Sequence, residues 1–325
     1  MKSLAVSSAV LCACLAAAAA HGAAWQPTKT VEIVVAQGPG GGMDRTARIL
    51  QKILQEQRLV SVPVVVTNRT GGAGVIAQNA VLAVGADAHY VHLTATPIIT
   101  NEITGVSATG YRSFTPLAYL YDEFVGFAVR PDSAFKTPKD LMAAVKSRPE
   151  GLSMSNASAL GNSNHVAAAL LAKSVGTDAK KLRVVIFNSG GQSVQAILGG
   201  HVDFIVAPVG NFVPQVQGGK LHVVAVAAPR RLEGALSAVP TWRESGADVV
   251  VSAVRMVFGP PGLKPDQVEF WEKTLAAVTE TAEWKQFVQQ VDGLPTYRGS
   301  RELSTYLAGE HQRYRAVLGE LGLAK

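Results

Sequence analysis

The chain has 325 residues, a length that suggests about two domains. Apolar residues make up 48% and charged residues only 17%, against ~25% charged in typical soluble proteins, which excludes a disordered chain or a coiled coil. The formal net charge of +6 indicates an anionic partner, which can be a nucleic acid, a membrane or a small anion.

Residues 1–24 have the pattern of a cleavable secretory signal peptide. Lys2 precedes an apolar run from Ser3 to Ala20, and small residues follow at Gly22–Ala24. A membrane anchor is the alternative, because the run approaches the length that spans a bilayer. The alanine-rich composition and the small residues at the end favour cleavage, so we expect a periplasmic protein.

Both cysteines, Cys12 and Cys14, lie within this segment. The mature chain is therefore expected to contain neither disulfides nor cysteine-ligated metals. The stretch Leu11–Cys14 faintly resembles a lipoprotein processing site, but it lies very early, so lipid anchoring is the less favoured alternative. Export without disulfides suits a bacterial periplasm, where about 300 residues bury enough apolar surface unaided.

After this segment, strand-like and helix-like patterns alternate along the chain. In the first half we expect strands at 31–35, 62–67 and 90–94 and helices at 43–57 and 73–84. The pattern then restarts, with strands at 127–129, 152–154, 184–187, 202–206 and 221–227 and helices at 141–146, 166–175 and 193–198. This alternation predicts an α/β protein with βαβ units and mostly parallel sheets.

The C-terminal part has a different character. Helices are expected at 267–278, 282–291 and 301–318, with Ser300 as the N-cap of the last one. These three segments predict a helical C-terminal extension.

A glycine-rich turn, Gln37–Asp44, lies between the first strand and the first helix. Three consecutive glycines allow backbone N–H groups to approach a ligand with no Cβ in the way. The start of the helix adds unpaired donors and a partial positive charge. A tight turn capped by Asp44 is the alternative, but three glycines exceed what a cap requires. The turn therefore predicts a site for a carboxylate or a phosphate.

Two turns in the second half also join a strand to a helix. Ser155–Asn164 is rich in hydroxyl and amide groups and leads into a helix at His165. It can hold a carboxylate through uncharged donors, or it can be a capped surface loop. Phe187–Gln192 carries a weaker signal of the same kind. His165 is interpreted as a structural histidine, with a ligand contact as the alternative.

Motifs of catalysis and of metal binding are absent from the sequence. Gly72–Ala77 matches a loose dinucleotide fingerprint, but no acidic residue follows at the required distance. The chain contains no Walker A motif, no G-x-S-x-G and no H-E-x-x-H, and its seven histidines are scattered. Asp203 has no partnered base or nucleophile, so we predict neither an enzyme, nor a metal site, nor a cofactor.

A set of short motifs follows in a fixed order along the mature chain. They are the turn within Pro27–Arg48, Asn68-Arg69 with Gly71–Gly74, Phe114–Pro116, Ser155–His165, Leu198–Asp203, Val239–Thr241 with Glu244–Gly246, and Phe258–Gly262. Each motif alone is unspecific, but the ordered set resembles the substrate-binding proteins of tripartite tricarboxylate transporters, also known as Bug receptors.

The resemblance implies a type II-like periplasmic-binding-protein fold, in which two αβ domains close on a ligand cleft. Residues 25–126 together with 228–325 are expected to form domain 1, and 127–227 domain 2. It also implies a monomer that binds an organic anion, a di- or tricarboxylate such as citrate, and delivers it to the membrane subunits of the transporter. A receptor that presents the same anion to a membrane sensor kinase is the alternative.

The resemblance also implies which residues hold the ligand. These are Gly40, Gly41, Gly42, Met43, Asp44, Thr96, Pro97, Ser155, Asn156, Ala157, Gly161, Asn162, Ser163, His165, Asn188, Ser189, Gly190 and Arg255. Many relatives carry an aspartate where Ala207 stands here. A pocket without this acid, and with Arg255, suits a more negatively charged ligand and the tricarboxylate-receptor branch. A hinge or surface role for Arg255 is the alternative.

The basic residues form no run longer than pairs such as Lys180-Lys181 and Arg230-Arg231. This scatter argues against a nucleic-acid partner. The excess positive charge is instead expected to attract small anions over a long range.

Overall fold

The computed structural model describes residues 25–157 and 159–325. The predicted signal peptide, with Cys12 and Cys14, lies outside the described residues. Within the described part, no helix combines the length and the apolar character needed to cross a bilayer.

The first lobe is built on a sheet of parallel strands. β1 (Val31–Val35) pairs with β2 (Val64–Asn68) on one side and with β3 (Tyr90–Thr94) on the other. The helices that connect and follow these strands are α2 (Gly42–Glu56), α3 (Val75–Leu82) and α4 (Pro97–Ile103). The apolar face of α2 packs with β1 in one core, because Ala47, Leu50 and Leu54 recur at helical spacing.

The second lobe repeats this plan. β5 (Ser153–Ala157) pairs in parallel with β6 (Arg183–Phe187) and β7 (Phe204–Pro208). The other elements of this lobe are β8 (His222–Val226), α5 (Pro138–Ser147), α6 (Ser163–Ser174), α7 (Gly190–Leu198) and α8 (Val213–Gln217). In both lobes, therefore, a polar or glycine-rich loop follows the carboxyl end of a parallel strand, as the sequence predicts.

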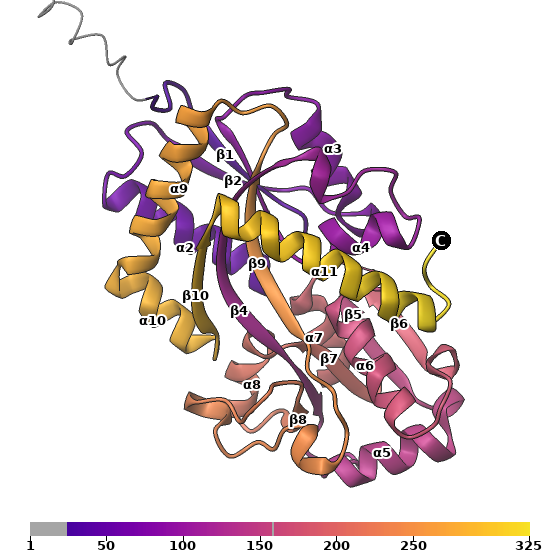
Figure 1. Ribbon diagram of the computed structural model, residues 1–325. Helices are drawn as coiled ribbons and strands as arrows, with labels where there is room; N and C mark the ends of the chain where they lie inside the picture. The colour runs from indigo at the N-terminus through magenta and orange to yellow at the C-terminus, as the bar shows by residue number, and fades with distance from the viewer. Residues whose placement is uncertain (1–24, 158) are drawn as a thin grey trace, which may run out of the picture.

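One long strand, β4 (Thr115–Val129), belongs to both sheets (Figure 1). Its residues 115–124 pair with β9 (Ser252–Gly259), and its residues 125–129 pair with β7 and β8. β10 (Leu294–Gly299) lies along the first part of β4. The sequence predicted only the last three residues of β4 and neither β9 nor β10.

The prediction of mostly parallel sheets is wrong. Parallel pairing is confined to the βαβ units, whereas every pair that involves β4 or β9 is antiparallel. The reason is the path of the chain, because β4 enters the second lobe and β9 returns from it in the opposite direction.

The two domain boundaries stay predictions, and the strand pairing bears on where they belong. The partners of β4 change between Phe124 and Val125. The segment 228–251 packs on the second lobe, where the Trp242 ring meets Phe127 edge-on with centroids 4.9 Å apart. The Val251 N–H donates to the Ala227 carbonyl at 2.9 Å.

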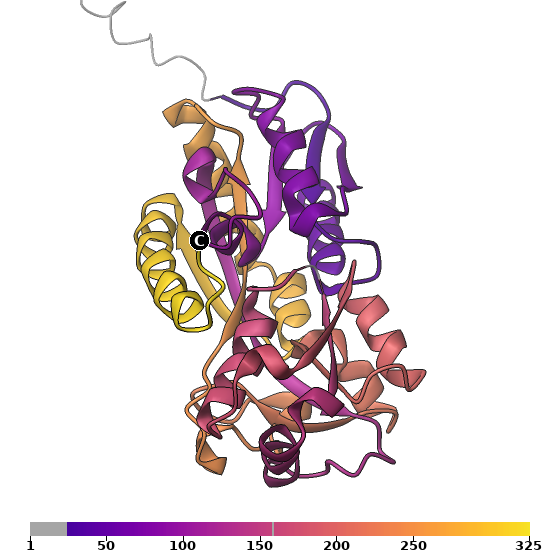
Figure 2. The ribbon, with the colours of Figure 1, turned by 90° about the vertical axis from the view of Figure 1, so that its right-hand side faces the viewer.

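The C-terminal helices α9 (Pro265–Glu280) and α10 (Ala282–Gln290) cover the first lobe, and α11 (Ser300–Glu320) lies beside the level where the lobes meet (Figure 2). The N-cap of α11 is Gly299 and not the predicted Ser300, whose N–H donates to Glu272 Oε1 at 3.1 Å. The C-terminal tail, residues 321–325, is tied to the first lobe because the Lys325 N–H donates to the Ile103 carbonyl at 2.8 Å.

Candidate functional site

The glycine-rich turn ends at the N-terminus of α2. Gly41 is the N-cap, so Asp44 lies in the first turn of the helix instead of capping it. Gly40 has a φ of +79°, a left-handed conformation that glycine adopts without strain. Met43 points into the core of the first lobe, so only its backbone is available to a ligand.

The buried Asp44 carboxylate holds this turn in shape. It accepts hydrogen bonds from Gly40 N (3.1 Å), Arg48 Nε (2.9 Å) and Asn68 Nδ2 (3.0 Å). Burial raises the pKa of Asp44, but these hydrogen bonds outweigh it, so its pKa lies below the usual value. Asp44 is thus ionised at neutral pH and committed to groups of its own lobe.

The turn meets the N-terminus of α7 from the second lobe. A Cβ added to Gly41 would lie 3.4 Å from the backbone N of Gly190. The Gly38 N–H donates to the Asn188 carbonyl at 3.4 Å. Two helix N-termini therefore converge here, and their partial positive charges favour an anion between them. Ser189 caps α7 by accepting a hydrogen bond from the Gln192 N–H.

An open pocket of about 670 Å³ lies at this meeting point. Gly38, Pro39 and Gly40 line it from the first lobe, and Ser189, Gly191 and Gln192 line it from the second. The structure thus brings the predicted Gly40–Asp44 and Asn188–Gly190 groups together.

A third loop, at residues 208–211, closes on the same helix end. Asn211 Oδ1 accepts a hydrogen bond from the Gly42 N–H at 2.9 Å, and Arg45 Nη2 donates to the Gly210 carbonyl at 2.5 Å. Neither Asn211 nor Arg45 was expected from the sequence. The lobes are therefore in direct contact at the N-terminus of α2, where the first N–H group of the helix donates to an uncharged amide oxygen.

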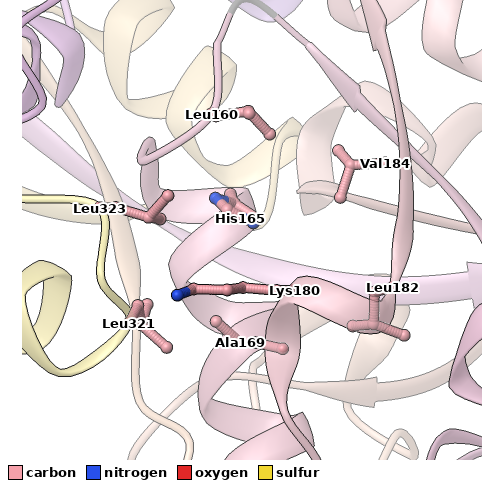
Figure 3. Close-up of a pocket in the computed structure, with 9 residues that line it drawn as sticks. Leu160, His165, Ala169, Lys180, Leu182, Val184, Leu321 and Leu323 are labelled. Atoms are coloured by element: carbon pink, nitrogen blue, oxygen red, sulfur yellow. The ribbon is translucent and has the colours of Figure 1, made fainter.

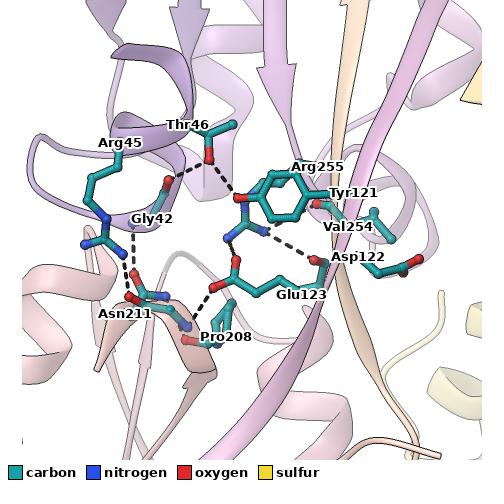
Figure 4. A network of polar contacts seen from close by, with 12 residues as sticks. Gly42, Arg45, Thr46, Tyr121, Asp122, Glu123, Pro208, Asn211, Val254 and Arg255 are labelled. Atoms are coloured by element: carbon teal, nitrogen blue, oxygen red, sulfur yellow. Dashed lines mark hydrogen bonds and ion pairs between the residues drawn. The ribbon is translucent and has the colours of Figure 1, made fainter. Parts of the chain in front are cut away.

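Arg255 lies beneath this contact and is buried (Figure 4). Its guanidinium forms an ion pair with Glu123, which is also buried and accepts a hydrogen bond from the Gly210 N–H at 2.9 Å. Burial lowers the pKa of Arg255, but Glu123 and Tyr121 raise it more, so the guanidinium stays charged. The Tyr121 hydroxyl is 2.9 Å from Thr46 Oγ1 on α2, which ties the pair to the first lobe.

This pair corrects the expectation of a site with Arg255 and no acid. Glu123 supplies the acidic group, so the pair has no net charge, and Arg255 is not a surface residue. Glu123 belongs to Tyr121-Asp122-Glu123, two acids in an otherwise apolar stretch, which is the signal that could have revealed it.

The polar loop after β5 lies at a second contact between the lobes. Asn162 caps α6, because its Oδ1 accepts from the His165 N–H at 3.0 Å. A Cβ added to Gly161 would lie 3.0 Å from Thr104 and 3.6 Å from Leu318 of the first lobe. Ser163 is the first residue of α6, and Ala157 is the last of β5.

His165, in the first turn of α6, holds this loop through a hydrogen bond. Its Nδ1 accepts the Gly161 N–H at 3.0 Å, so the ring proton lies on Nε2. Burial lowers the pKa of His165 to about 4, and the ring is therefore neutral at pH 7.

Of the remaining predicted residues, Thr96, Ser155 and Asn156 are buried and Pro97 is partly buried, and none takes part in the glycine turn's hydrogen bonds. Thr96 precedes α4 and Pro97 is the first residue of that helix. The Ser155 hydroxyl and Asn156 Oδ1 have no hydrogen-bond partner among the described residues. Over the same residues, no group of three His, Cys, Asp or Glu side chains is arranged to hold a metal.

Two βαβ lobes joined by long strands, with two helix N-termini meeting between them, define a two-lobed ligand-binding protein. The family model described as tripartite tricarboxylate transporter family receptor matches residues 46–323, and the chain belongs to this family of solute-binding receptors. The predicted family and fold are thereby confirmed.

Individual relatives are distant but cover most of the chain. BugT of Bordetella pertussis is 25% identical over 302 residues, which is 91% of this chain and 90% of BugT. MatC from Rhodopseudomonas palustris, solved with bound malate, has a TM-score of 0.81 at 24% identity and covers 90% of this chain and 99% of its own. R. palustris Rpa4515, solved with adipate, has a TM-score of 0.84 at 23% identity, and the match covers 92% of this chain and 99% of Rpa4515.

The substitution Glu123→Gln should leave the buried guanidinium of Arg255 without its countercharge. Removing one partner of a buried ion pair costs about 3–5 kcal/mol. We expect a loss of that size in the free energy of unfolding, measured by urea titration and circular dichroism. The double variant Glu123→Gln/Arg255→Met is the control and should recover much of the loss. A Glu123→Gln variant as stable as the parent would contradict this role.

The substitution Asn211→Ala should favour opening of the ligand-free protein. It removes a hydrogen bond that exists only when the lobes touch, worth about 1 kcal/mol, or about a fivefold change in the ratio of closed to open molecules. Small-angle X-ray scattering should show a larger radius of gyration. Asn188→Ala is the matched control, since only its backbone carbonyl contacts Gly38. Equal radii for both variants would count against the contact.

Proposed function

We propose that this protein is exported to the periplasm through residues 1–24, binds a di- or tricarboxylate between its lobes, and delivers it to the membrane subunits of a tripartite tricarboxylate-type transporter. The observation that carries the proposal is the convergence of the α2 and α7 N-termini at a pocket shared by both lobes. Backbone N–H groups at helix N-termini bind carboxylates well. Malate in MatC and adipate in Rpa4515, both dicarboxylates, support this ligand class.

Asn211 indicates how the ligand enters. Where the two lobes touch, the Gly42 N–H donates to the uncharged amide oxygen of Asn211. A carboxylate oxygen in this position would form a charge-assisted hydrogen bond, which is roughly twice as strong as a neutral one. Ligand contacts from both lobes exist only when the lobes are closed, so binding shifts the population toward closure.

The charges around the site determine how the ligand is recognised. The Glu123–Arg255 pair has no net charge, and Asp44 is held by its own lobe. We therefore assign recognition to the N–H groups of the two helix ends, with the Arg45 guanidinium, which donates to the Gly210 carbonyl, beside them. Citrate is one candidate among di- and tricarboxylates. The net charge of the whole chain helps only to draw anions toward the protein.

Isothermal titration of ligand-free protein with malate, adipate and citrate tests the ligand class. We expect saturable binding of at least one of them, and none of putrescine, which has the opposite charge. Failure of every di- and tricarboxylate to bind would refute the proposal. Loss of uptake of the bound anion in cells without the receptor, restored by the receptor gene, would test delivery to a transporter.

The substitution Gly42→Ala should weaken carboxylate binding. Its Cβ would lie 3.1 Å from Asn211 Oδ1 and 3.2 Å from Arg255 Nη2, in the space beside the N–H group that we assign to the ligand. Because hydrogen bonds to charged groups contribute about 1.5–3 kcal/mol, we expect a tenfold or greater rise in the dissociation constant by titration.

Gly309→Ala is the matched control, since Gly309 lies in α11 with nothing within 4 Å of an added Cβ. It should bind like the parent. Equal affinities of the Gly42→Ala and Gly309→Ala variants would exclude the α2 N-terminus from the site.

A further inference from the structure

A second cavity, of about 310 Å³, lies beneath the C-terminal tail (Figure 3). Its walls come from α6, from the segment between α6 and β6, and from the tail, and they are mostly leucine, valine and alanine side chains. The leucines that line it are Leu160 and Leu182 of the second lobe and Leu321 and Leu323 of the tail. We call this cavity the tail pocket.

Two polar groups enter the tail pocket. Lys180 extends across it toward Leu321, and its ammonium lies so close to the tail that a Cβ added to Gly322 would be 2.6 Å from it. His165 also lines the pocket, and its Nε2 carries the proton because Nδ1 accepts the Gly161 N–H. Among the described residues, no group accepts a hydrogen bond from this Nε2.

Lys180 differs from its neighbours in having no countercharge. Lys173 pairs with Glu320, and Lys181 pairs with Glu150 at 3.6 Å. Within the described ranges, no carboxylate lies within 4 Å of the Lys180 ammonium. The exposed Lys180, which has no ion-pair partner, and an N–H donor thus line a mostly apolar pocket, an arrangement that is complementary to an anion with an apolar body.

The size of the tail pocket also suits a ligand. An apolar cavity of about 150 Å³ is enough to bind benzene. At about 310 Å³, the tail pocket can hold a small aliphatic chain together with a carboxylate.

We propose that the tail pocket is a second ligand site, for small amphipathic monocarboxylates. The aliphatic chain contacts Leu182, Leu321 and Leu323, and the carboxylate accepts hydrogen bonds from the Lys180 ammonium and from His165 Nε2. This site is separate from the pocket at the glycine turn, and the proposal does not depend on the ligand bound there.

The site has a consequence for closure, because its walls belong to both lobes. The tail is tied to α4 of the first lobe, whereas Lys180 and Leu182 belong to the second. A ligand in the tail pocket therefore favours the closed arrangement. By thermodynamic reciprocity, it also raises the affinity for any ligand that binds between the lobes.

Hexanoate is the probe for the tail pocket. Isothermal titration of the full mature protein should show saturable binding of hexanoate and none of hexylamine, which has the same chain and the opposite charge. Amide NMR signals of residues 180–182 and 321–323 should shift during the titration.

The decisive comparison is between two adjacent lysines. Lys180→Gln should weaken hexanoate binding about tenfold, because it removes a charged partner of the carboxylate. Lys181→Gln makes the same change one residue away and should leave binding within about twofold of the parent. Lys180 is exposed, so the variant is expected to fold, which its thermal unfolding curve checks.

Three results would overturn the proposal. They are an absence of hexanoate binding, equal binding by the Lys180→Gln and parent proteins, and binding that Gly42→Ala abolishes but Lys180→Gln leaves intact. The last result would place hexanoate at the glycine turn. Carboxylate binding between the lobes is measured with malate, adipate and citrate, so failure there is distinguishable from failure here.

Discussion

The buried ion pair between Glu123 and Arg255 is the interaction on which the arrangement of the two lobes depends. Its members lie on β4 and β9, the strands that carry the chain between the lobes. Two charges taken out of water are tolerable only when they are paired and hydrogen-bonded. Glu123 and Arg255 pair with each other, and Glu123 also accepts a hydrogen bond from the Gly210 N–H. Because Gly210 belongs to the loop that reaches the α2 N-terminus, the pair links the crossing strands to the candidate site.

The same constraint leaves Arg255 and Asp44 occupied by partners of their own at the place where the lobes meet. Glu123 neutralises the one buried arginine near the α2 N-terminus, and Asp44 is occupied within its own lobe. What remains for an anion is the partial positive charge of two helix ends with their N–H groups, and the Arg45 guanidinium in the first turn of α2. In the proposed function, such donors bind the carboxylate itself and leave the remainder of the ligand little constrained.

Two of the contacts between the lobes differ in their chemistry. At the glycine turn, backbone groups of one lobe meet an asparagine amide of the other. At the C-terminal tail, Leu321 and Leu323 cover an apolar surface of the second lobe, and Lys180 of that lobe lies beside them. The lobes are therefore held together by polar hydrogen bonds at one place and by apolar contact at the other.

The sequence by itself determined the local elements and the family. The strands predicted at 31–35 and 90–94 have those bounds in the structure, because β-branched runs between turn residues have few alternatives. The glycine turn was recognisable because its residues are contiguous. Only the tertiary structure decided which groups meet there. Glu123 and Arg255 are 132 positions apart, and Gly42 and Asn211 are 169 apart. No local pattern records such pairings, because they arise from the path of β4 and β9 between the lobes.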